Sequence, residues 1–186
     1  VPFQGRPFQK VRYGAAAHHC AALLVVSPFK GHMAAGYGGA VKNVSMGLAG
    51  RATKQQMHGE VKPAYEDLKH CDLCGICASV CPAGAIEAEG NLMGFDWERC
   101  EGCGDCIVHC PSGALRIQWN AKPEILGEKQ AEVAKAILDH KHGNALFLNF
   151  LLDVTPDCDC VPWSDHPIVA DIGILASRDP IAIDAA

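Results

Sequence analysis

Two cysteine runs constrain this chain more than any other feature of its sequence. The first reads CDLCGICASVCP over residues 71–82, and the second reads CEGCGDCIVHCP over residues 100–111. Both have the spacing C-x2-C-x2-C-x3-C-P, and each cysteine of the first run has a counterpart 29 positions later. The glycine after the second cysteine and the proline after the fourth also recur, so the segment is an internal duplication.

The spacing within each run indicates how the thiols group. Three cysteines at positions i, i+3 and i+6 can converge from one tight loop on one iron–sulfur cluster, while the fourth points away and ligates the other cluster. We therefore predict two [4Fe–4S] clusters with crossed ligands. The first set is Cys71, Cys74, Cys77 and Cys110, and the second is Cys81, Cys100, Cys103 and Cys106.

Structural zinc and disulfides are the alternatives for these eight cysteines. Zinc sites usually combine two separated C-x2-C pairs or mix cysteine with histidine. Disulfide frameworks are typical of small secreted domains, whereas 49% of these 186 residues are hydrophobic. Reduced thiols and clusters predict a cytoplasmic, anaerobic setting. The apolar residues expected to form the core around the clusters are Ile76, Val80, Ile107, Val108 and Ile117.

The net charge of −5 is unevenly distributed along the chain. Residues 1–63 contain eight Lys or Arg and one Glu, whereas residues 120–186 contain eleven acids and five Lys or Arg. This asymmetry predicts attraction between the two flanks, or an anion site in the basic one. No apolar run approaches the ~20 residues that span a bilayer. Few aromatic residues and no nucleic-acid motif argue against a nucleic-acid partner.

A glycine-rich basic stretch covers residues 29–63. Glycine lets the backbone approach a ligand and turn its amide groups towards an anion, and the interleaved cations add charge. The candidate anion-binding or substrate-binding residues are Lys30, His32, Lys42 and Arg51. The alternative is a packed glycine-rich segment with a solvated basic face.

Apolar runs and helical patterns alternate on both sides of the cysteine segment. Residues 21–26, 145–152 and 172–176 read as buried strands, residues 10–13 as a short edge strand, and residues 125–142 as an amphipathic helix. A further helix is expected from Pro180, capped by residues 177–179. Alternating strands and helices predict an α/β fold with a mainly parallel sheet.

This pattern divides the chain into two predicted domains. A discontinuous α/β domain covers residues 1–65 and 120–186, and a ferredoxin-like two-cluster module is inserted over residues 66–119. The chain starts without Met and stops inside an expected helix, so we expect it to be truncated at both ends.

Cys158 and Cys160 lie outside the two runs, in the segment CDC. Both follow a predicted strand, as His32 does, and loops at the carboxyl ends of parallel strands gather at one edge. We therefore expect these three residues to share one rim. A metal there would draw its remaining ligands from Asp157, His166 or His58. Two buried or reactive thiols are the simpler interpretation, and a disulfide between residues two apart is uncommon.

Several segments outside the runs resemble the domain-of-unknown-function 362 family of iron–sulfur proteins. The resemblance rests on FKGH at residues 29–32, GGAVKNVSMGLAGR at residues 38–51, CDC at residues 158–160 and DIGILASRDPIAIDAA at residues 171–186. The cysteine runs themselves resemble bacterial two-cluster ferredoxins. The family implies iron–sulfur clusters without specifying a substrate.

The leading functional expectation is single-electron relay through two [4Fe–4S] clusters, to a redox partner protein or subunit or to a site in the α/β domain. One alternative is an oxidoreductase with its own anionic-substrate or metal site at the rim. The other is an iron–sulfur binding or scaffold module.

Overall fold

A computed structural model describes residues 1–59, 62–117, 123–163 and 165–186. Its contacts divide the chain into two compact units. We call Val1–Gly50 with Lys122–Ala186 the α/β unit, and Arg51–Ala121 the cysteine unit. The first predicted boundary, at residue 65, thus lies later in the chain than the observed one. The second, at residues 119 and 120, lies outside the described residues.

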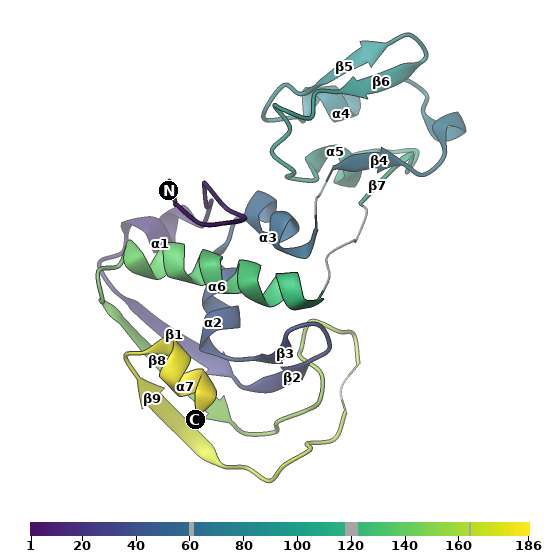
Figure 1. The fold of residues 1–186 in the computed structure, drawn as a ribbon. Helices are drawn as coiled ribbons and strands as arrows, with labels where there is room; N and C mark the ends of the chain where they lie inside the picture. Colours follow the sequence, from purple (N-terminus) through teal and green to yellow (C-terminus); the bar gives the residue numbers. More distant parts are fainter. Residues whose placement is uncertain (60–61, 118–122, 164) are drawn as a thin grey trace. The chain divides into compact units, whose positions relative to one another are not determined.

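The α/β unit is built on a three-stranded sheet with the strand order β1-β8-β9 (Figure 1). A two-stranded hairpin follows β1, and helices pack beside the sheet. In chain order its elements are α1 (Ala15–His19), β1 (Leu23–Pro28), β2 (Lys30–His32), β3 (Gly36–Gly38), α2 (Ala40–Lys42), the π-helix η1 (Asn43–Gly47), α6 (Pro123–Asp139), β8 (Ala145–Leu151), β9 (Gly173–Ser177) and α7 (Pro180–Ala185).

The α/β class is confirmed, but the prediction of a mainly parallel sheet is wrong. β1 pairs with β8 in parallel, with Val25 opposite Phe147, whereas β9 pairs with β8 antiparallel, with Phe147 opposite Ser177. A parallel return needs a crossover, usually a helix. The described residues between β8 and β9 form no helix; they first run past β2, where the Gly31 amide donates to Thr155, and β9 then pairs antiparallel with β8.

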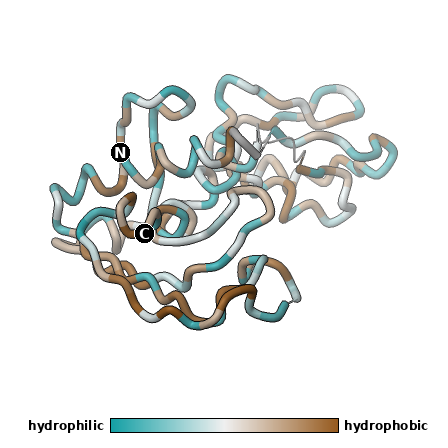
Figure 2. Tube along the Cα trace, turned by 60° about the horizontal axis from the view of Figure 1, so that its bottom comes forward, coloured by the Kyte–Doolittle hydropathy of each residue, from teal (hydrophilic) through white to brown (hydrophobic). Residues whose placement is uncertain are grey.

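Buried and exposed side chains alternate along β1 and β8, so the sheet has one buried face and one exposed face. Val25 and Phe147 are buried, whereas Leu24, one residue away, is 61% exposed. The helices α2 and α6 lie on the buried side, and Figure 2 shows the hydrophobic residues along the strands. The prediction that residues 21–26 form a fully buried strand is therefore wrong for one of its two faces.

The sequence explains where α7 begins and how the chain turns after α6. Asp179 caps α7 by accepting hydrogen bonds from the amides of Ile181 and Ala182, and Pro180 occupies the first turn, as predicted. The chain leaves α6 through Gly143, whose φ of +81° favours glycine. Residues 10–13 do not form the predicted strand, because Lys10 and Tyr13 make only isolated bridges.

The cysteine unit consists of short elements around a small core. They are α3 (Arg51–His58), β4 (Pro63–Tyr65), the 3-10 helix η2 (Leu68–His70), α4 (Ile76–Ser79), β5 (Ile86–Glu89), β6 (Leu92–Phe95), α5 (Asp105–Val108) and β7 (Leu115–Ile117). β4 pairs with β7 and β5 with β6, both antiparallel. One buried hydrophobic cluster contains Cys77, Ile86, Met93, Cys106 and Leu115. Ile76 and Val108 were predicted to be core but are exposed, because α4 and α5 turn their cysteines inward instead.

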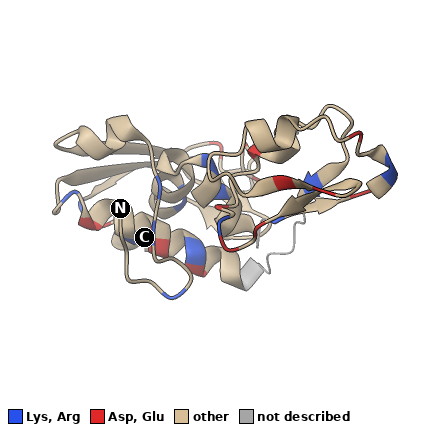
Figure 3. Cartoon of the chain, turned by 90° about the horizontal axis from the view of Figure 1, so that it is seen from above, with Lys and Arg blue, Asp and Glu red and all other residues tan. Residues whose placement is uncertain are grey.

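Both units carry residues of both charge signs (Figure 3). No described helix combines the length and the apolar character that crossing a bilayer requires.

Candidate functional site

Each cysteine run makes the same turn into a short helix. Gly75 precedes α4 with a φ of +73°, and Gly104 precedes α5 with a φ of +75°. This left-handed conformation suits glycine, because a Cβ atom would strain it. The turn directs the third cysteine of each run, Cys77 or Cys106, into the core as a buried side chain.

Two cavities in the cysteine unit are each lined by four cysteines. The first is lined by Cys71, Cys74, Cys77 and Cys110, and the second by Cys81, Cys100, Cys103 and Cys106. Each cavity thus combines three cysteines of one run with the last cysteine of the other. These are the two sets predicted from the spacing, and a tetrathiolate set is the donor set that a [4Fe–4S] cluster uses.

The thiols at these cavities are crowded and partly desolvated. Burial raises the pKa of Cys77, and Cys74 and Cys110 raise it further. Burial also raises the pKa of Cys106 to about 12, with further contributions from Cys103 and Cys100. Raised pKa values keep free thiols protonated, and a bound metal would displace those protons. Four sulfurs at each cavity are the donor set that would hold such a metal centre.

Polar groups from other parts of the unit approach the sulfurs. The amide of Ala85 donates to Cys81 Sγ at 3.3 Å, and the hydroxyl of Tyr65 lies 4.0 Å from Cys71 Sγ. Met93 holds that hydroxyl in place, because its carbonyl accepts from it at 2.8 Å and its amide donates to it at 2.9 Å. Hydrogen bonds to ligand sulfurs tune cluster potentials. Sequence reasoning missed Tyr65, because its approach to Cys71 depends on the pairing of β4 with β7.

The four candidate anion-binding residues are divided between the two units. Lys30 and Lys42 line a pocket of about 200 Å³ in the α/β unit, together with Asn43, Cys158 and Asp159 among others. Arg51 belongs to the cysteine unit, where it pairs with Asp105. Arg51, which was predicted to act with these lysines, is therefore not among the residues that line this pocket.

The two lysines of this pocket are partly desolvated. Lys30 Nζ lies 3.6 Å from Asp159 Oδ1 and donates to the carbonyl of Asp153 at 3.2 Å. Its side chain is only 15% exposed. Burial lowers the pKa of Lys42, and the carboxylate of Asp159 opposes that shift. The ion pair of Lys30 with Asp159 joins the basic flank to the acidic one, as the charge distribution predicted.

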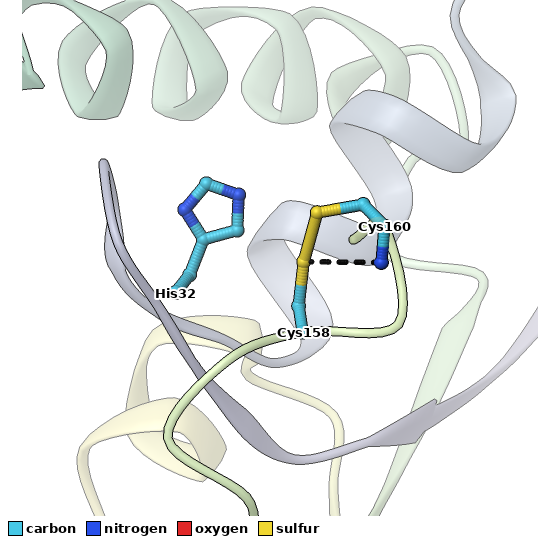
Figure 4. Close-up of side chains that lie close together, drawn as sticks. All are labelled: His32, Cys158 and Cys160. Atoms are coloured by element: carbon cyan, nitrogen blue, oxygen red, sulfur yellow. Dashed lines mark hydrogen bonds between the residues drawn. A yellow bond between two sulfur atoms is a disulfide. The ribbon is translucent and has the colours of Figure 1, made fainter. Parts of the chain in front are cut away.

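The structure brings His32, Cys158 and Cys160 together beside this pocket (Figure 4). One ligand atom from each of the three lies within 4.8 Å of the others, so they share a rim as expected from the sequence. The two cysteines are joined by a disulfide. Asp157 and His166 are not in this group, and His58 belongs to the cysteine unit.

Gly31 explains how the two loops of the rim meet. Its amide donates to the carbonyl of Thr155 at 2.8 Å, and a Cβ atom at this position would clash with the carbonyl of Pro156. Glycine is therefore required for this close approach, which brings the loop of Cys158 alongside β2.

A buried carboxylate organises the chain after the hairpin. Asp184 Oδ1 accepts from the amide of Ala40 at 2.6 Å, and its Oδ2 accepts from the amide of Val41 at 2.9 Å. Asn149 Nδ2 also donates to Oδ1, at 2.7 Å. These contacts tie α7 to the start of α2 and to β8, next to the pocket. Sequence reasoning missed Asp184, since its partners lie far away along the chain.

Comparison with known families agrees with the resemblance noted in the sequence. The family described as "Domain of unknown function (DUF362)" matches residues 1–186. A comparison with curated proteins found no match. Because the match covers the whole chain, this protein belongs to the DUF362 family.

Proposed function

We propose that this protein is an iron–sulfur electron-transfer protein, or a subunit of one, with two [4Fe–4S] clusters in its cysteine unit. The observation that carries the proposal is the lining of the two cavities, each of which contains four cysteines drawn from both runs. When bound, such clusters supply one-electron redox chemistry.

The residues of the chain have two roles in this proposal. The eight cysteines hold the clusters, and Ile86, Met93 and Leu115 form an apolar shell that limits water around them. The Ala85 amide, which donates to Cys81 Sγ, would stabilise negative charge on that sulfur and thereby raise the reduction potential of the cluster that Cys81 holds. The single proton of the Tyr65 hydroxyl goes to the Met93 carbonyl, so Tyr65 packs beside Cys71 without donating to it. A redox partner protein would donate or accept the electrons.

Metal analysis under anaerobic conditions tests the proposal directly. We expect about eight iron and eight sulfide per chain, on the two-cluster ligation of [4Fe–4S] ferredoxins. Reduction should give an electron paramagnetic resonance signal of two interacting clusters. The reduced protein should pass electrons to a one-electron acceptor such as cytochrome c.

Cys74→Ser and Cys20→Ser form a matched pair of variants for this test. Cys74 lines the first cavity, whereas Cys20 lies in the α/β unit and donates to the carbonyl of Ala17. Only the first variant should lose iron and electron transfer. Zinc in place of iron, with no signal on reduction, would overturn the proposal in favour of structural metal sites.

A further inference from the structure

Cys158 and Cys160 differ in their access to solvent, although they lie two residues apart. Cys158 is 8% exposed, whereas Cys160 is an exposed residue. Their Cα atoms are 5.3 Å apart, within the range that a disulfide spans. The amide of Cys160 donates to Cys158 Sγ at 3.4 Å. The pair thus consists of one accessible sulfur and one sheltered sulfur that holds a backbone hydrogen bond.

Stabilisation of the fold does not explain this bond. A disulfide stabilises mainly by restricting the unfolded chain, and the effect grows with the length of the loop it closes. This one joins residues with a sequence separation of 2, so it restricts very little. Exposed disulfides are the labile, regulatory or catalytic ones, and Cys160 is exposed.

His32 is oriented as a hydrogen-bond donor towards the sulfurs. Its Nδ1 accepts from the amides of Ala34 at 3.1 Å and Ala35 at 3.0 Å. A neutral imidazole that accepts at Nδ1 carries its proton on Nε2. Figure 4 shows one ring nitrogen turned towards the disulfide and the other turned away. This tautomer is unsuited to binding a metal through Nε2 but is suited to donating to a thiolate.

The pocket beside the pair favours anions. Two of its lining residues are lysines and one, Asp159, is a carboxylate, so its charged side chains sum to a positive charge. A π-helical segment, η1, supplies Asn43 and Met46 to the lining. Such irregular helical turns are found frequently at functional sites. The volume of about 200 Å³ suits part of a small molecule.

We propose that Cys158 and Cys160 form a redox-active dithiol–disulfide pair that exchanges with anionic disulfide or thiol compounds bound beside Lys30 and Lys42. This function is separate from the clusters and does not require them.

The exchange balances without any further cofactor. The thiolate of Cys160 attacks one sulfur of the compound's disulfide, forms a mixed disulfide and releases one thiolate. The thiolate of Cys158 then attacks Cys160 Sγ, which forms the Cys158–Cys160 disulfide and releases the second thiolate. Both released thiolates take protons from water. The compound gains two electrons and the protein loses two, and a second thiol compound reverses the steps.

Two disulfide probes of opposite charge test the proposal on anaerobically purified, full-length protein. Glutathione disulfide carries a net negative charge and cystamine a net positive one. Differential alkylation and mass spectrometry of the peptide that contains residues 158 and 160 follow the pair separately from the cluster cysteines. We expect reversible oxidation, with the anionic probe reacting roughly tenfold faster than the cationic one at low salt.

Variants assign the role of each residue. Cys158→Ser should trap a stable mixed disulfide between glutathione and Cys160, whereas Cys160→Ser should trap little, because Cys158 is sheltered. Lys42→Gln should remove most of the preference for the anionic probe. Lys135→Gln is the matched control, because Lys135 is an exposed lysine on α6 that pairs with Asp139. It should leave the preference unchanged.

Three outcomes would overturn the proposal. They are thiols at residues 158 and 160 that glutathione disulfide does not oxidise, equal rates with both probes, and stoichiometric zinc binding by the reduced pair that Cys160→Ser abolishes. The last would assign a metal site instead. Iron content measured in the same samples tests the clusters independently, so either proposal can fail without the other.

Discussion

The two units of this protein differ in what holds them together. The α/β unit buries large apolar side chains, among them Val133, Ile137 and Phe147, and adds the hydrogen-bonded carboxylate of Asp184. In the cysteine unit, one buried hydrophobic cluster includes two of the cysteines, Cys77 and Cys106, beside Ile86, Met93 and Leu115. Units of this size rarely gain enough stability from apolar burial alone, so metal or disulfides usually contribute.

The cysteines of the two units also lie in different surroundings. Eight cysteines of the cysteine unit surround two cavities and crowd one another. The pair in the α/β unit lies at a rim beside two lysines, with one sulfur accessible. The two groups of sulfurs therefore lie in different settings, the first around enclosed cavities and the second beside a pocket, with Cys160 exposed.

The largest expected effect comes from removing metal. Treatment with an iron chelator and an oxidant should unfold the cysteine unit, because binding energy at its cavities contributes to its folding. Hydrogen exchange should show amides of β4 and β7 losing protection, while amides of β1 and β8 keep theirs. Equal protection in both strand pairs before and after treatment would show that the cysteine unit is stable without metal.

The next effect separates the two cavities. Cys110→Ala should remove the cluster assigned to the first run, although Cys110 belongs to the second, and lower iron from about eight to about four per chain. Iron analysis with electron paramagnetic resonance measures the loss, and Cys20→Ser serves as the control. If the signal of the cluster assigned to the second run disappeared instead, the crossed grouping would be wrong.

A smaller effect is confined to the α/β unit. Asp184→Ala leaves the amides of Ala40 and Val41 and the side chain of Asn149 without their acceptor. We expect a loss of about 3–5 kcal/mol in the free energy of unfolding, because buried donors without an acceptor are costly. Denaturant unfolding measures it. Asp139→Ala, which removes only the surface ion pair with Lys135, should cost about 0.5 kcal/mol or less.

The smallest effect concerns the rim. Gly31→Ala forces a Cβ atom against the carbonyl of Pro156 and should cost about 1–3 kcal/mol, as overpacking does. The displaced loop should also slow disulfide exchange at Cys160. Gly127→Ala is the control, because its new Cβ meets no atom within 4 Å. It should stabilise α6 by about 0.5–1 kcal/mol. If the Gly31→Ala and Gly127→Ala variants had the same thermal stability, the close approach of Gly31 to the Pro156 carbonyl would be contradicted.

The sequence by itself determined the features that depend on short-range spacing. The cysteine intervals predicted which cysteines line each cavity, because turn geometry fixes which thiols can converge. Short apolar runs predicted β1, β8 and β9, and a helical apolar stripe predicted α6, each to within a few residues. The position of two loops after apolar strands predicted that His32 and the Cys158–Cys160 pair would share a rim.

The tertiary structure decided which distant groups meet. It paired Arg51 with Asp105, joined the Tyr65 hydroxyl to the backbone of Met93, and brought Asp184 to the amides of Ala40 and Val41. It also made β9 antiparallel to β8. Local sequence patterns do not predict these contacts. A polar side chain pairs with whichever complementary group lies close to it in the folded chain, and the path of the chain between the two residues decides which group that is.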